Sequence, residues 1–70
     1  MHLSKREKQV LKMLCLSTEE IAKHLGISIK TAKTYICKLY YKFPLARNRA
    51  GIIFEALRTE IINVNEVVTD

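Results

Sequence analysis

A sequence signal for the start of a helix occurs twice in the first third of the chain. In each, a serine is followed three residues later by a glutamate, Ser4 with Glu7 and Ser17 with Glu20. In such a capping box the two side chains satisfy free backbone N–H groups at the beginning of a helix. Apolar residues then recur at helical spacing. The pattern predicts a helix over residues 5–15 and a second over 18–25, ended by Gly26.

Two further helices are indicated by polar residues that precede apolar stretches. Ser28 can accept hydrogen bonds from the N–H groups of a helix over 29–43. That helix is expected to stop before Pro44, because proline disfavours helical geometry in the residue before it. Asn48 is the corresponding cap of a helix over 49–61.

Length and apolar patterning limit the architecture. Seventy residues make one domain, which we expect to span 1–70 as an all-α arrangement of four helices without a β-wing. The last segment, 63–70, fits either a frayed helix end or an extended arm. Apolar runs are far shorter than the ~20 residues that a membrane-spanning helix needs, and the N-terminus lacks the apolar region of a secretory signal. The sequence therefore predicts a cytoplasmic protein that does not contact a membrane.

The charge is unevenly distributed along the chain. The net charge is +5, and no acidic residue occurs between Glu20 and Glu55. The basic residues in that interval are Lys23, Lys30, Lys33, Lys38, Lys42, Arg47 and Arg49. A block of one sign over half the domain creates a positive field, for which nucleic acid is the commonest partner. The alternative is a solvated surface without a partner.

Few residues are suited to catalysis or metal binding. Cys15 and Cys37 lie within predicted helices, outside any CxxC spacing, and are expected to be reduced thiols. His2 and His24 have no metal-binding partner at a familiar spacing. The chain also lacks a nucleophile with its base and a glycine-rich phosphate loop. We therefore expect neither an enzyme nor a cofactor.

Residues 20–32 carry the motif that points to a function. A short helix, a turn with glycine and a longer helix follow one another at the spacing of a helix-turn-helix. Ala22 is small enough for two helices to cross closely, Gly26 permits the turn, and Ile27 anchors the turn in the core. Such a pair can present its second helix to the major groove of DNA, which is about 12 Å wide.

The helix over 29–43 is expected to have two chemically different faces. The buried face is apolar, with Ala32, Ile36, Leu39 and Phe43. The opposite face and the helix N-terminus are the candidate DNA-binding residues, Ser28, Lys30, Thr31, Lys33, Thr34, Cys37, Lys38, Tyr41 and Lys42. Lys33 can donate to guanine O6 and N7, and Thr34 can bond a base or contact a thymine methyl. Candidates for the DNA backbone are Ser28, Lys30, Thr31, Lys38, Lys42 and Arg47.

Together these motifs resemble the LuxR-type (GerE-like) DNA-binding domain. The resemblance covers about residues 3–62. It is carried by Leu3-Ser4-Lys5-Arg6-Glu7-Lys8-Gln9-Val10-Leu11, Glu20-Ile21-Ala22, Leu25-Gly26-Ile27-Ser28, Thr31-Ala32-Lys33, Lys42-Phe43 and Asn48-Arg49. It implies that the third helix reads the major groove, with Lys33, Thr34 and Cys37 on bases, and that the fourth helix forms a homodimer on two-fold-related half-sites. Glu7 is expected to fix helix packing through an ion pair.

The fourth helix leaves two interpretations open. Its apolar residues are expected at a dimer interface, Ile52, Ile53, Ala56 and Leu57. The alternative is that these side chains close the core of the monomer. The chain also departs from the family pattern, with a shorter link between the first two helices and Pro44 in place of a glycine. Other candidate partners are RNA polymerase, through a sigma-factor-like module, and a larger regulator that the chain inhibits by pairing with it.

Overall fold

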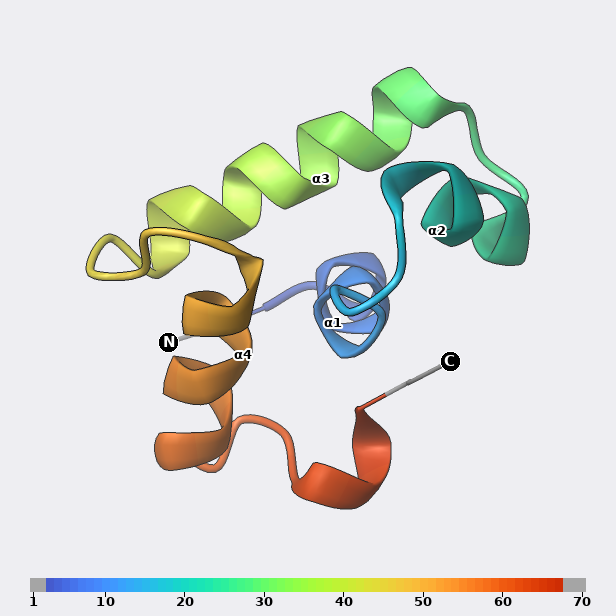
Figure 1. The fold of residues 1–70 in the computed structure, drawn as a ribbon. Helices are drawn as coiled ribbons and strands as arrows, with labels where there is room; N and C mark the ends of the chain where they lie inside the picture. The colour runs from blue at the N-terminus through green and yellow to red at the C-terminus, as the bar shows by residue number, and fades with distance from the viewer. Residues whose placement is uncertain (1–2, 68–70) are drawn as a thin grey trace.

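The structure is a computed structural model that describes residues 3–67, and within that range it contains helices and no strand. The elements are α1 Lys5–Lys12, α2 Thr18–Leu25, α3 Ile29–Lys42, α4 Arg49–Arg58 and a 3-10 turn, η1, Val64–Glu66. The predicted all-α class is confirmed. α3 runs along one side of the molecule, with α1 below its middle and α2 and α4 toward its two ends (Figure 1).

Each α-helix begins at a residue whose side chain caps it. Ser4 Oγ accepts the N–H of Glu7 at 3.1 Å, and the Glu7 carboxylate accepts the N–H of Ser4 at 3.0 Å. Ser17 and Glu20 form the same reciprocal pair. The caps of α3 and α4 are Ser28 and Asn48. These bonds satisfy N–H groups that have no partner within the helix, so the helices begin where the capping residues indicate.

The end of α1 differs from the expected bound. The apolar pattern extends to residue 15, but the helix ends at Lys12. The N–H groups of Met13 and Leu14 bond to carbonyl oxygens three residues back, at 3.0 and 3.3 Å, which tightens the last turn. The tightened turn brings both Leu14 and Leu16 into the core.

The later helices also end before their expected bounds. α3 ends at Lys42, one residue early, and α4 ends at Arg58 rather than at 61. Beyond α4 the Ile61 N–H donates to the Ala56 carbonyl oxygen at 2.9 Å, and Glu60 has a left-handed φ of 60°. The chain therefore turns back at this point instead of continuing the helix.

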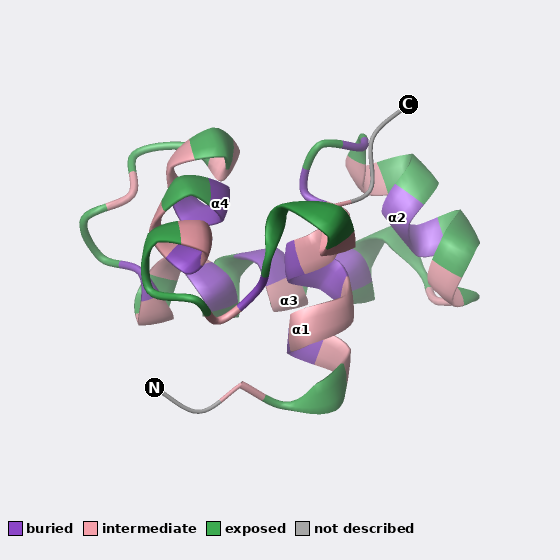
Figure 2. Cartoon of the chain, turned by 90° about the horizontal axis from the view of Figure 1, so that it is seen from below, coloured by how far each residue is buried: buried purple, intermediate pink, exposed green. Residues whose placement is uncertain are grey.

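One hydrophobic core holds the four helices together. α3 packs against α1 and α2, and α1 packs against α4. The buried sides of all four helices face one another (Figure 2). The core residues are Val10, Leu11, Leu14, Leu16, Ile21, Ala22, Ala32, Ile36, Leu39, Phe43, Ile52, Ile53, Ala56 and Ile62. Among these are the four residues that the sequence assigns to the buried face of the third helix, although Phe43 lies just beyond the end of α3.

The segment after α4 folds back and contacts the helices. Ile62 is buried, and Val67 packs against the core. Between them lies η1, which Asn63 caps, and its Glu66 forms an ion pair with Lys12 of α1 at 3.0 Å. The segment is therefore neither a frayed helix nor an extended arm as far as residue 67. Residues 68–70, like His2, lie outside the described residues.

Candidate nucleic-acid interface

The turn between α2 and α3 fixes how α3 is presented. Gly26 has a φ of +65°, a left-handed conformation that glycine adopts without steric cost. The N–H of Ile27 then donates to the Ala22 carbonyl oxygen at 3.0 Å, the long bond of a Schellman motif. Ile27 is half-buried and packs against the core. These contacts stop α2 and redirect the chain into α3, as a helix-turn-helix requires.

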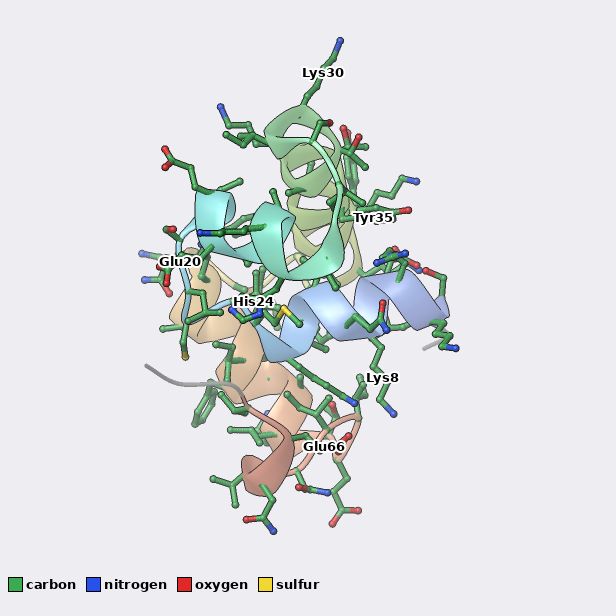
Figure 3. The ribbon with its side chains drawn as sticks, turned by 90° about the vertical axis from the view of Figure 1, so that its right-hand side faces the viewer. Lys8, Glu20, His24, Lys30, Tyr35 and Glu66 are labelled. Atoms are coloured by element: carbon green, nitrogen blue, oxygen red, sulfur yellow. The ribbon has the colours of Figure 1, made fainter. Side chains whose placement is uncertain are left out.

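α3 exposes one continuous stripe of side chains along its length. At 100° per residue, positions 30, 33, 34, 37 and 41 fall within one sector of about 100°, on the side of the helix away from the buried residues. We call these residues the α3 stripe: Lys30, Lys33, Thr34, Cys37 and Tyr41. All five are exposed, and Tyr41 is 88% exposed. Lys30 extends away from the body of the molecule at the beginning of the helix (Figure 3). The structure therefore brings five of the nine predicted DNA-binding residues together on one open surface.

The hydroxyl groups near the start of α3 are partly occupied within the chain. Ser28 Oγ accepts the N–H of Thr31 at 3.1 Å and donates to Thr31 Oγ1 at 2.9 Å. Thr31 therefore keeps its own hydroxyl hydrogen for donation to a ligand. Thr34 Oγ1 donates to the Lys30 carbonyl oxygen at 3.1 Å, so the hydroxyl of this exposed side chain retains only its lone pairs for a ligand.

The lysines of α3 differ in what they contact. Lys30 and Lys33 are exposed. Lys38 lies beside the α3 stripe with its ammonium 5.5 Å from the centre of the Tyr35 ring, within cation–π range. Lys42 is 2.9 Å from the Glu7 carboxylate and its side chain is only 32% exposed. Because no acidic residue occurs within α3, nothing on the helix itself offsets this positive charge.

The ion pair between Lys42 and Glu7 joins the end of α3 to α1. Lys42 and the N–H of Ser4 both donate to Glu7 Oε1. The hydrogen bond from Lys42, followed by the backbone bond from Ser4, lowers the pKa of Glu7 from 4.5 to about 2. The predicted packing role of Glu7 is confirmed. Lys42, expected at the DNA backbone, is held toward α1 and lies off the α3 stripe.

α4 buries most of the residues that the sequence places at a dimer interface. Ile52, Ile53 and Ala56 lie in the core of the single chain, and Leu57 is half-buried against it. Three of the four residues therefore close the core of the monomer, as the alternative interpretation predicts. On the outer side of α4, Ala50 and Phe54 are exposed, and Phe54 is 63% exposed.

Sequence reasoning missed the role of Arg49, the first residue of α4. Its guanidinium donates to the Leu16 carbonyl oxygen at 2.6 Å and to Thr18 Oγ1. These partners lie in the link between α1 and α2 and at the start of α2, more than thirty residues away. In the sequence Arg49 is one member of a basic block, and nothing in the pattern separates it from neighbours that remain exposed.

Residues 3–67 contain neither a metal-binding cluster nor a membrane-spanning helix. No group of three or more His, Cys, Asp or Glu side chains in that range could hold a metal ion. Cys15 and Cys37 are exposed free thiols. None of the helices is both long enough and apolar enough to cross a bilayer.

Comparisons with known proteins agree with the helix-turn-helix geometry. The family model described as bacterial regulatory proteins of the luxR family, GerE, matches residues 1–56. Searches of curated proteins and of solved structures gave no match. The family consists of helix-turn-helix regulatory domains that bind DNA and is not an enzyme family. The matched range contains α1, α2 and α3 and most of α4. The chain therefore belongs to the luxR family of bacterial regulatory proteins.

Proposed function

We propose that this protein is a cytoplasmic transcriptional regulator that binds specific sequences of double-stranded DNA as a homodimer, with α3 in the major groove. The observation that carries the proposal is the α3 stripe. It combines ammonium donors with a hydroxyl, a thiol and an aromatic ring on one open helix face. A purely solvating surface has no need of Cys37 and Tyr41 between its lysines.

The shape of α3 suits the groove. A helix with its side chains is about 10–12 Å across, which matches a major groove about 12 Å wide. α3 has 14 residues, and the other helices lie on one side of it (Figure 1). The opposite side is therefore free to enter the groove over several base pairs.

The residues of α3 divide into two groups by their position. Lys33, Thr34 and Cys37 lie at the middle of the α3 stripe and are proposed to contact base edges. The flanking groups are proposed to contact phosphates and sugars, which position the helix without reading the sequence: Ser28, Lys30, Thr31, Lys38 and Tyr41. Thr31 suits this task because its hydroxyl hydrogen remains available beside the N-terminus of α3.

Homodimer formation is proposed through the outer side of α4. Ala50, Phe54 and Leu57 share that side at helical spacing, and Phe54 is a large exposed aromatic side chain. Aromatic side chains that become buried at an interface often carry much of its binding energy. We propose that a two-fold axis beside Phe54 relates the two α3 helices of a DNA-bound dimer.

Selection from random DNA duplexes at two salt concentrations tests the proposal. A dimeric, sequence-specific regulator enriches a roughly palindromic motif, and its affinity falls steeply as salt rises. An absence of both enrichment and salt-sensitive binding would overturn the proposal in favour of a module that binds another protein.

Replacing Lys33 by Ala is expected to weaken binding to the selected site by about 1–3 kcal/mol and to relax the preference at one base position. Replacing Lys38 by Ala is expected to weaken binding equally on all sequences and to lower the salt dependence. Titration of selected and scrambled duplexes measures both effects. Lys8→Ala is the control, because Lys8 lies on the far side of α1 from α3 (Figure 3). Equal, sequence-independent losses for Lys33 and Lys38 would remove Lys33 from the base-reading group.

Replacing Phe54 by Glu is expected to weaken self-association by about 1–2 kcal/mol or more, because a charge replaces an apolar contact. Sedimentation should then show a monomer at concentrations where the natural chain is a dimer. Val64→Glu is the matched control, since Val64 is exposed on a different segment. The same sedimentation for both variants would exclude Phe54 from the interface.

A further inference from the structure

The chemistry of α3 limits which bases it can read. Its charged hydrogen-bond donors are the ammonium groups of Lys30 and Lys33 in the α3 stripe and of Lys38 beside it. Residues 29–42 include no Asp, Glu, Asn or Gln. Of the carboxylates on neighbouring helices, Glu7 is bonded to Lys42, and Glu20 is bonded to the backbone of Ser17.

The base pairs differ in what they display to such a surface. Guanine presents two acceptors, O6 and N7, which suit a lysine. Adenine is read best by the paired donor and acceptor of Asn or Gln, and the amino group of cytosine is read by Asp or Glu. Thymine presents a methyl group that an apolar side chain can contact. With amides and carboxylates absent from α3, guanine and thymine are the bases that its lysines and its methyl and thiol groups fit.

Thr34 and Cys37 are the groups on the α3 stripe that suit a thymine methyl. The hydroxyl hydrogen of Thr34 is used in its bond to the Lys30 carbonyl oxygen, and this exposed side chain also carries a methyl group. Cys37 follows three residues later on the same face and is exposed. A thiol behaves as a small apolar group that is only a weak hydrogen-bond donor.

We infer that each half-site contains a guanine bound by Lys33 and, one or two base pairs away, a thymine whose methyl group contacts Cys37 or Thr34. The spacing follows from the helix. Lys33 and Cys37 are four residues apart, or about 6 Å along the axis, and base pairs are about 3.4 Å apart. This inference rests on the proposed function, because it concerns the sequence that the same helix reads.

Replacing single thymines in the selected site by deoxyuridine tests the inference, because it removes the methyl group alone and leaves the protein unaltered. We expect the replacement of one thymine in each half-site to raise the Kd about fourfold, which is the effect of losing one apolar carbon contact. Cys37→Ser and Thr34→Ser identify the contacting residue, since Thr34→Ser keeps the hydroxyl and removes only the methyl. In the variant that lacks the contacting group, replacing thymine by deoxyuridine should no longer change the Kd.

The outcomes separate the inference from the proposed function. A selected motif in which the base relaxed by Lys33→Ala is adenine or cytosine would overturn the inference and leave sequence-specific binding standing. If no replacement of thymine by deoxyuridine changes the Kd, the thymine contact is overturned and sequence-specific binding still stands. If no motif is enriched at all, both the inference and the proposed function fail.

Discussion

Replacement of Ile62 by Ala is expected to lower the free energy of unfolding by about 2–5 kcal/mol, the range for truncating a buried aliphatic side chain. Ile62 is only 2% exposed although it lies beyond the last α-helix. It also lies outside residues 1–56, the range that the family model matches. The segment after α4 thus completes the core of this protein. Urea or thermal unfolding followed by circular dichroism measures the loss.

Val64→Ala is the control for Ile62→Ala. Val64 belongs to the same segment but is 72% exposed. Its truncation should change the unfolding free energy by no more than about 0.5 kcal/mol, as for other surface positions. Similar small changes for both variants would mean that the segment after α4 does not contribute to the core in solution.

Replacement of Glu7 by Ala is also expected to have a large effect. It should lower the free energy of unfolding by about 2–4 kcal/mol. It removes the Glu7 half of the capping box, the bond from the Ser4 N–H, worth about 0.5–1.5 kcal/mol, and a charge-assisted bond to Lys42, worth about 1.5–3 kcal/mol. Glu66→Ala, which breaks the more exposed pair with Lys12, should cost less than about 1 kcal/mol. The same unfolding experiment compares the two variants, and equal losses would contradict the role given to Glu7.

The Glu7 contribution should also depend on pH. Because the pKa of Glu7 falls from 4.5 to about 2 on folding, mainly through Lys42, the folded state favours the ionised carboxylate. This stabilisation is fully present above about pH 4.5 and is lost as pH falls toward 2. The difference in stability between the natural chain and Glu7→Gln should therefore shrink over that window. Glu66 has a lowered pKa as well, so only this comparison isolates Glu7.

Local signals in the sequence predict the helix starts but not the helix ends. A cap such as Ser4 acts on N–H groups two or three residues away, so it can be recognised in the sequence. The end of α1 depends instead on how Leu14 and Leu16 reach the core, and the end of α4 depends on a chain reversal at Glu60. Both are set by tertiary packing. The buried position of Ile62 depends on the same reversal, which leaves no short-range pattern.

The candidate site also has features that the local sequence predicts and features that depend on long-range contacts. Helical periodicity is enough to place Lys33 and Cys37 on the side of α3 away from the buried Leu39, because that relation is local. It cannot show that Lys42 pairs with Glu7, since the partner is 35 residues away in the chain. It also cannot decide whether an apolar residue such as Ile52 faces its own core or a second copy. The two cases give the same pattern, and only the packed structure separates them.

The bonds that Arg49 makes have a mechanical consequence. They tie the first residue of α4 to the Leu16 carbonyl and the Thr18 hydroxyl, where α2 begins. The helix proposed to pair two copies is thereby locked to the unit that carries α3. In a dimer built this way, the two reading helices hold a constant angular phase around the DNA axis. One extra base pair between half-sites turns the second by about 35°, since a turn contains 10–10.5 base pairs. Two α3 helices held at a fixed relative orientation could not adjust to that rotation. Such a dimer would therefore bind half-sites separated by one spacer length only.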